Sequence, residues 1–136
     1  ESAGFVYSSA GTSGEGDGWY YVNGTATCGV NVPCRDEQMD DYVQTVLHNY
    51  PAVLEGMPRP AGYAVVYRNW VREIEGMARF GRMGASAFHP QIAGTAGRSV
   101  VLERFCAYLA ENREVWCSTC LDIAQHFLAA QEVTAC

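Results

Sequence analysis

The 136-residue chain contains no lysine, because all nine of its basic side chains are arginines. Mechanisms that need a Schiff-base lysine or a phosphate-loop lysine are therefore excluded. Arginine is also outnumbered by fifteen acidic residues, which gives a formal net charge of -6. With no basic patch to neutralise phosphates, we expect neither nucleic acid nor an anionic membrane surface as a partner.

Long hydrophobic runs are also missing, and the longest apolar stretches fall far short of the ~20 residues of a membrane span. The first five residues lack an initiator Met and both the charged and the apolar regions of a signal peptide. We therefore expect a removed leader or a piece of a longer product. Asn23-Gly24-Thr25 fits a glycosylation acceptor. The sequence does not decide the cellular compartment. We slightly favour the cytoplasm over secretion.

Metal-binding motifs are a third absence, since the chain has no His-x-x-x-His, His-Glu-x-x-His or Asp-Asp-Gly sequence. We therefore expect no metal site within this chain. Cys117-x-x-Cys120 could join Cys28 and Cys34 in a tetrathiolate site, but the gap between the latter two is unusual. Core cysteines or disulfides are the favoured interpretation of the six cysteines. The flanking sequence of a thioredoxin-like motif is lacking as well.

The length fits one domain over residues 1–136. The apolar run 5–7 predicts a strand, which a glycine-rich loop follows. Residues 19–22 and 25–32 predict a β-hairpin around an Asn23-Gly24 turn. The acidic stretch 33–42 predicts a surface loop with one short helix.

The second half of the chain predicts helices alternating with strands. Apolar residues at three- and four-residue spacing predict a helix from Gly62 onward and another around Phe105. Between them, 85–88 predicts a buried strand that stops at His89-Pro90, because proline cannot continue a ladder. A loop is expected over 91–97. The apolar positions of the two helices are Tyr63, Val66, Tyr67, Trp70, Val71 and Ile74, then Val101, Leu102, Phe105, Tyr108 and Leu109.

A last strand and helix complete this predicted alternation. Residues 115–117 predict the strand, and Thr119 with Asp122 resembles a capping box that opens the helix. In parallel sheets with crossover helices, catalytic groups gather beyond the carboxyl ends of the strands. His89 is placed at such an end.

His89 is the first candidate for chemistry, because an imidazole can donate or accept a proton near neutral pH. The alternative is a half-buried His that bonds a loop carbonyl. Asp40 and Asp41 could orient a catalytic group or contact a substrate, or they could lie in a solvated turn. Arg98 could hold a polar substrate group with its planar guanidinium, or it could pair with Glu103 at the surface.

The order of several motifs resembles that of the NodB-type polysaccharide deacetylase superfamily, in its allantoinase-like and peptidoglycan deacetylase-like branch. The most specific block is Phe88-His-Pro-Gln-Ile-Ala-Gly94, with Arg98 and Leu102 after it. The other similar segments are Gly4-Phe-Val-Tyr-Ser-Ser9, Val32-Pro33, Met39-Asp-Asp-Tyr42, Val115-Trp116 and Asp122-Ile-Ala-Gln-His126. Ser8 stands where the family pattern has Asp, and Asp122 where it has Glu.

The resemblance covers only the second half of the family domain. The first half carries an Asp-Asp motif and a His-x-x-x-His motif, and neither has a counterpart here. The resemblance therefore implies an α/β fold, the C-terminal half of a distorted (β/α) barrel. Because half a barrel leaves sheet edges unpaired, a second polypeptide is expected to complete it. That chain would carry a divalent metal, zinc above all.

The function implied is a subunit or processed fragment of a metal-dependent hydrolase of non-peptide carbon–nitrogen bonds. Its substrate would be a small amide, a cyclic amide or an N-acetyl amino sugar. By motif position, His89 would be the catalytic acid that protonates the leaving nitrogen, with Asp40, Asp41 and Arg98 lining or bracing the cleft. Two alternatives stay open, a non-catalytic scaffold or binding subunit, and a small disulfide-stabilised secreted protein.

Overall fold

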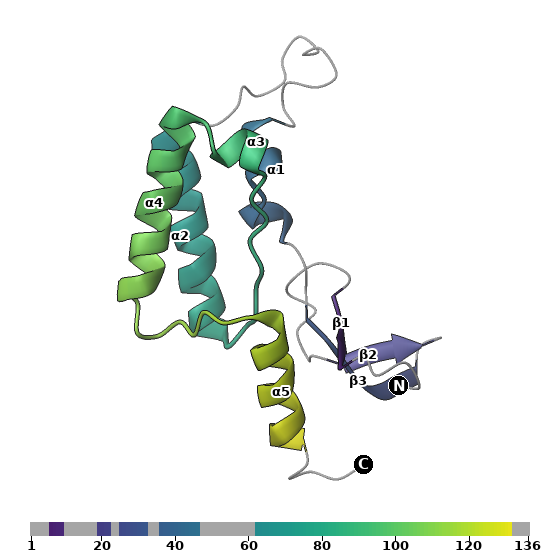
Figure 1. The fold of residues 1–136 in the computed structure, drawn as a ribbon. Coiled ribbons are helices and arrows are strands. Elements are labelled where there is room, and N and C mark those ends of the chain that lie inside the picture. The colour runs from purple at the N-terminus through teal and green to yellow at the C-terminus, as the bar shows by residue number, and fades with distance from the viewer. Residues whose placement is uncertain (1–5, 10–18, 23–24, 33–35, 47–61, 132–136) are drawn as a thin grey trace.

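The computed structural model describes residues 6–9, 19–22, 25–32, 36–46 and 62–131. Three short strands near the N-terminus precede a set of helices (Figure 1). The strands are β1 (Tyr7–Ser8), β2 (Trp19–Val22) and β3 (Thr25–Asn31). The helices are the 3-10 helix η1 (Glu37–Met39) and α1 (Asp41–Thr45), α2 (Tyr63–Phe80), α3 (Pro90–Ala93), α4 (Ala96–Glu111) and α5 (Cys120–Gln131).

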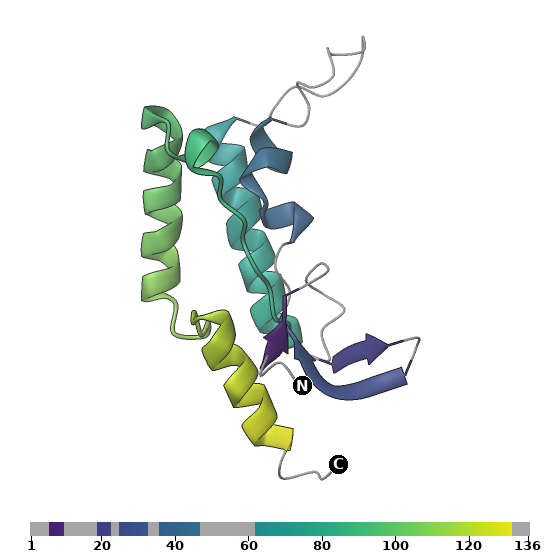
Figure 2. The same cartoon turned by 45° about the vertical axis from the view of Figure 1, so that its right-hand side comes forward.

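The two longest helices, α2 and α4, lie side by side in both ribbon views (Figures 1 and 2). Their apolar stripes form the main core, where Phe105 is fully buried and Trp70 is 3% exposed. The Trp70 ring lies 5.3 Å from the rings of both Phe88 and Phe105. Full burial of one such ring is worth about 1.5–3 kcal/mol. The helices predicted from these two stripes are confirmed.

Helix α2 ends at Gly81, which adopts a left-handed conformation with φ 61°. This conformation lets the Arg82 N–H bond the Met77 carbonyl at 2.8 Å, and the Gly81 N–H bond the Ala78 carbonyl at 3.4 Å. A residue with a Cβ is strained at this φ, so glycine suits the position.

Helix α5 begins with the predicted capping box. The Thr119 hydroxyl donates to Asp122 Oδ2 at 2.6 Å, and Asp122 N–H donates back to Thr119 Oγ1 at 3.2 Å. Hydrogen bonds from the Thr119 and Ser118 side chains lower the pKa of Asp122 from its ordinary 3.8. The helix packs Ala124 against Val32, which follows β3 directly, and the two form a second, smaller core.

The strands form one small sheet in the order β1-β3-β2. β1 runs parallel to β3, and β2 runs antiparallel to it with a register shift between Trp19 and Tyr20. The antiparallel pair agrees with the expected hairpin. Its Asn23-Gly24 turn, Phe5 and the glycine-rich loop lie outside the described residues.

The predicted α/β class, the C-terminal half of a distorted (β/α) barrel, is wrong. The described part of the chain is mostly helical, and the expected strands at 85–88 and 115–117 belong to no sheet. The carbonyls of Ala85 and Ala87 accept instead from the N–H groups of Asp36 and Asp41, at 2.8 and 3.1 Å. A short apolar run can be buried in an extended conformation without strand partners, and periodicity does not distinguish the two cases.

Two predicted loops also differ from the structure. Residues 33–35 of the acidic stretch lie outside the described residues, and its expected short helix agrees with η1 and α1. Its surface position was wrong, since Met39 and Asp41 are each 1% exposed. Within 91–97, the short helix α3 and the first turn of α4 replace the expected loop. Among the described residues, none of the helices combines the length and the apolar character that crossing a bilayer requires.

Candidate functional site

The site is built on the first turn of α1. The Asp40 carboxylate accepts the N–H groups of Tyr42 at 2.8 Å and Val43 at 3.4 Å, so it caps this helix. Capping by Asp40 makes Asp41 the first helical residue. The Asp41 N–H is bound to the Ala87 carbonyl, which places its carboxylate beside the end of the segment 85–89.

The Asp41 carboxylate holds His89 at two points. Asp41 Oδ1 lies 2.6 Å from His89 Nδ1. The His89 backbone N–H also donates to the carboxylate, at 3.0 Å from Oδ2 and 3.2 Å from Oδ1. Proline at the first position of α3 makes His89 the residue before that helix, in an extended conformation that needs no strain.

This pair combines a buried anion with a partly exposed ring. The Asp41 side chain is 2% exposed, whereas that of His89 is 38% exposed. Because an ionised carboxylate can only accept, the short contact requires a proton on Nδ1. Nε2 is then the ring nitrogen that can take up a proton, and the imidazolium so formed can give that proton to a substrate atom.

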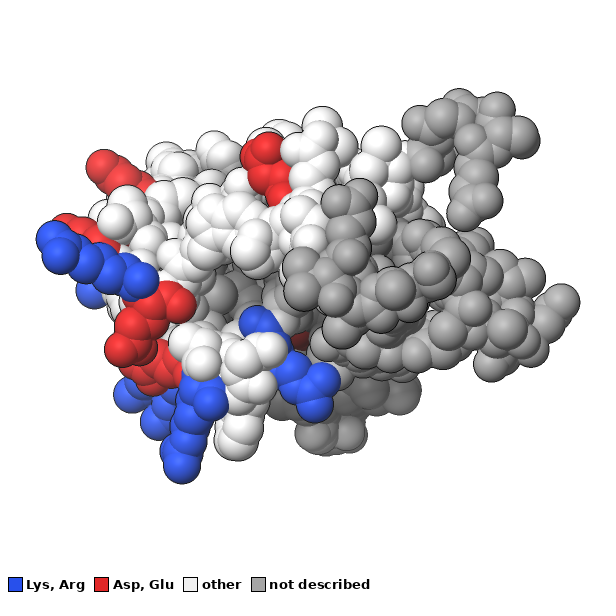
Figure 3. All heavy atoms as spheres, turned by 90° about the horizontal axis from the view of Figure 1, so that it is seen from below, with Lys and Arg blue, Asp and Glu red and all other residues white. Residues whose placement is uncertain are grey.

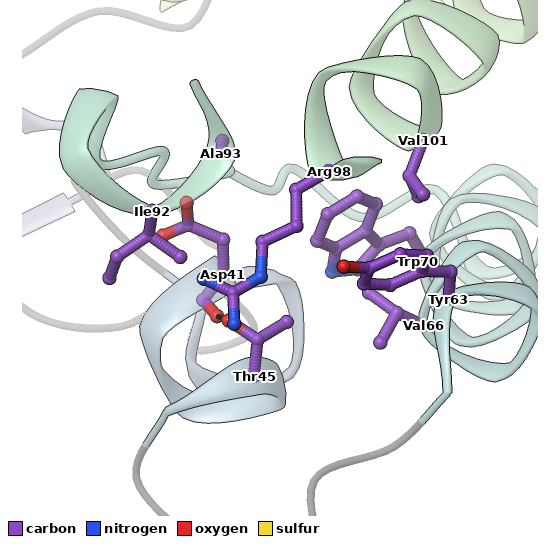
Figure 4. A pocket seen from close by; sticks show the side chains of 9 residues that line it. All are labelled: Asp41, Thr45, Tyr63, Val66, Trp70, Ile92, Ala93, Arg98 and Val101. Carbon is purple, nitrogen blue, oxygen red and sulfur yellow. Dashed lines mark hydrogen bonds between the residues drawn. The ribbon is translucent and has the colours of Figure 1, made fainter. Parts of the chain in front are cut away.

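A small pocket borders the pair and brings Arg98 to it (Figure 4). The Arg98 side chain extends between Asp41 and Trp70. The pocket leaves room of about 10 Å³ for the centre of a water-sized molecule, which suits a single oxygen atom. Its lining is Asp41, Thr45, Tyr63, Val66, Trp70, Ile92, Ala93, Arg98 and Val101.

Two buried donors of this pocket lack an acceptor. Neither Arg98 Nε nor Trp70 Nε1 has a hydrogen-bond partner among the described residues. A buried donor left unsatisfied costs about 1–3 kcal/mol, so such groups are uncommon and call for an acceptor from outside. The pocket therefore has the polarity to receive an oxygen acceptor.

Asp40, Asp41 and His89 are also the described residues whose ligand atoms come closest to a metal-binding set, all within 4.8 Å of one another. The contacts do not fit a bound ion. Two ligands of one zinc ion lie about 3 Å or more apart, whereas His89 Nδ1 and Asp41 Oδ1 are at hydrogen-bonding distance. Asp40 Oδ1 is occupied by two backbone N–H groups and lies 3.9 Å from Nδ1. We assign no metal to this set.

Of the four predicted site residues, Asp41 and Arg98 line the pocket, His89 is hydrogen-bonded to Asp41, and Asp40 caps the helix that carries Asp41. Trp70 was not predicted as a site residue, because its place on the apolar stripe of α2 marks it as core. The sequence carries no signal for its unsatisfied indole N–H. His126 lies elsewhere, with its ring 5.1 Å from that of Trp116.

Comparison with protein-family models, with curated proteins and with solved structures finds no match to this chain. The resemblance to polysaccharide deacetylases therefore stays a prediction from the motifs.

Proposed function

We propose that the chain is a subunit or processed fragment of a hydrolase of non-peptide carbon–nitrogen bonds, and that His89 gives a proton to the leaving nitrogen. The observation that carries this proposal is the 2.6 Å contact between His89 Nδ1 and Asp41 Oδ1. A buried carboxylate that holds a partly exposed imidazole by Nδ1 fixes both the orientation and the tautomer of the ring. General acid–base catalysis needs both.

The neighbouring pocket supports an amide as the substrate. A carbonyl oxygen could accept from both Arg98 Nε and Trp70 Nε1, the two buried donors without an acceptor among the described residues. Asp41 lines this pocket, and its negative charge disfavours an anionic substrate. A neutral linear amide, cyclic amide or N-acetyl amino sugar therefore fits best.

We expect the divalent metal, zinc above all, on a second polypeptide, because the carboxylates and imidazole here are committed to hydrogen bonds. When bound there, it would supply an activated water for attack on the carbonyl. The residues of this chain would orient the substrate and supply the proton.

The test is a steady-state assay of amide hydrolysis by the assembled protein, with His89→Ala compared with His126→Ala. We expect His89→Ala to lower kcat by about 10²–10⁴-fold with little change in KM. The alkaline limb of the pH–rate profile, where a general acid loses its proton, should disappear. His126→Ala should leave kcat unchanged, because that ring packs on Trp116.

An unchanged kcat in an intact His89→Ala assembly would contradict the proposal and favour a scaffold subunit. The same contacts also support the scaffold alternative. The hydrogen bond from the His89 backbone N–H to the Asp41 carboxylate joins α1 to the segment before α3, whether or not the ring takes part in catalysis. Among the cysteines whose side chains the structure describes, Cys106, Cys117 and Cys120 carry free thiols, which lends no support to the alternative of a disulfide-stabilised protein.

A further inference from the structure

A second, larger cavity lies away from the His89 site. It has a volume of about 600 Å³ and opens where the end of α2, the segment 81–86, the end of α4 and α5 meet. In the view from below, this side of the molecule is hollowed at its centre (Figure 3). The volume falls within the range of ordinary small-ligand sites.

Four side chains that carry sulfur line this cavity. Two thiols, from Cys117 and Cys120, and two thioethers, from Met77 and Met83, line it. The Met77 sulfur packs so closely on Gly84 that a Cβ there would lie 2.3 Å from it. Thiolates and thioethers are the ligands that soft metal ions prefer.

The two thiols flank the capped start of α5. Cys120 is the first residue of the helix, and Cys117 lies two residues before the capping Thr119. Both thiols are free, and Cys117 is exposed. Cys120 lines the cavity together with Cys117.

The surroundings distinguish between the two common thiophilic ions. A structural zinc site needs four ligands, usually thiolates and imidazoles. Within the described ranges, however, Asp40, Asp41 and His89 are the one set of three or more His, Cys, Asp or Glu with ligand atoms within 4.8 Å. Although His126 lines the same cavity, it does not complete such a set with the two thiols. Cu(I) needs fewer ligands and accepts thioethers, so the lining suits it better.

We propose that Cys117 and Cys120 form a Cu(I) site in this cavity, which the thioethers of Met77 and Met83 also line. On binding, two S–H bonds break, two S–Cu bonds form and two protons leave to solvent. Copper stays in the +1 state, so no oxidant or reductant is consumed. The site is separate from the metal expected on a second polypeptide.

The test is an anaerobic titration of the full chain with Cu(I) in competition with a chromophoric Cu(I) chelator. We expect one tightly bound equivalent per chain, with only sulfur in the first shell by X-ray absorption. Cys117→Ser and Cys120→Ser should each lower the affinity for this Cu(I) ion by at least about 100-fold. Cys106→Ser is the matched control, because this exposed thiol on α4 is not part of the cavity lining, and it should change nothing.

If Cys117→Ser still bound one Cu(I) ion per chain with the wild-type affinity, the proposal would be overturned and the ion would be assigned to other thiols. Nitrogen or oxygen ligands in the first shell would overturn it as well. Far-UV circular dichroism of each variant checks the fold. Cys117→Ser replaces an exposed side chain outside any helix, so it should leave the helices intact.

Discussion

At the residue scale, the site depends on the carboxylate of Asp41, which lies in the acidic stretch that the sequence predicted to be at the surface. Asp41 is 1% exposed and accepts both the ring and the backbone N–H of His89. Burial of a carboxylate is costly unless hydrogen bonds compensate for lost hydration. The three contacts to His89 supply that compensation.

Asp41→Ala should therefore destabilise the fold by about 3 kcal/mol, because it leaves the His89 donors without their acceptor. Urea denaturation of the variant measures this free energy of unfolding. Asp36→Ala is the control, since Asp36 is only partly buried and caps a single N–H, that of Gln38 at 2.9 Å. Its loss should cost about 1 kcal/mol. Equal losses in the two variants would refute the role given to Asp41.

A second residue-scale prediction concerns Asp122. Because its pKa is lowered in the folded state, its contribution to stability is present above its ordinary value of 3.8 and is lost as the pH falls through the folded pKa. Thr119→Ala removes the main cause and should return the pKa toward 3.8, as an NMR titration of the carboxyl group would measure. Thr95→Ala should leave it unchanged, since the Thr95 hydroxyl bonds the Ile92 carbonyl. No movement of the pKa in Thr119→Ala would contradict the capping box.

At the element scale, two glycines of one helix should respond to the same substitution with opposite signs. Gly81→Ala should destabilise the protein by about 1 kcal/mol, because φ is 61° there. Gly76→Ala, in the interior of α2, should stabilise it by about 0.5–1 kcal/mol, because alanine favours the helix. A Cβ meets nothing within 4 Å at either site, so packing does not confuse the comparison. Thermal unfolding of the pair measures both signs, and two shifts of equal sign would contradict the helix end at Gly81.

The sequence predicts the elements that carry their own local signal. Helices α2 and α4 follow from apolar residues at helical spacing, and α5 from the Thr119–Asp122 capping box. The segments 85–88 and 115–117 carry only three or four residues of pattern, so their extended backbone was mistaken for strand. What holds 85–88 is its bonding to Asp36 and Asp41, which are distant in sequence. No local pattern could have revealed those partners.

The same limit applies to the candidate site. His89 and Arg98 were found by residue type and motif position; His89 is bonded to Asp41, and Arg98 lines the same pocket as Asp41. The burial of Asp40 and Asp41 was not predicted, because paired acidic residues usually lie in solvent. Trp70 was missed because an unsatisfied indole N–H is a property of the packed core and leaves no trace in the sequence.

At the scale of the whole molecule, two cores meet at the segment that leads to His89. The larger core joins α2, α4 and Met39, and the smaller joins Val32 and α5. From Gly81 the chain runs back along α2, as Figure 2 shows, to deliver Phe88 to the larger core and His89 to Asp41. The position of the imidazole is thus set by packing and by one carboxylate, without the sheet that the motif order had implied.

The central claim, that Asp41 fixes the His89 ring with its proton on Nδ1, is tested most directly by long-range ¹H–¹⁵N NMR of the imidazole nitrogens in the folded chain. At a pH where the ring is neutral, we expect its proton on Nδ1 and not on Nε2, and we expect Asp41→Asn to lose that preference. A neutral ring that carries its proton on Nε2 in the wild-type protein would contradict it.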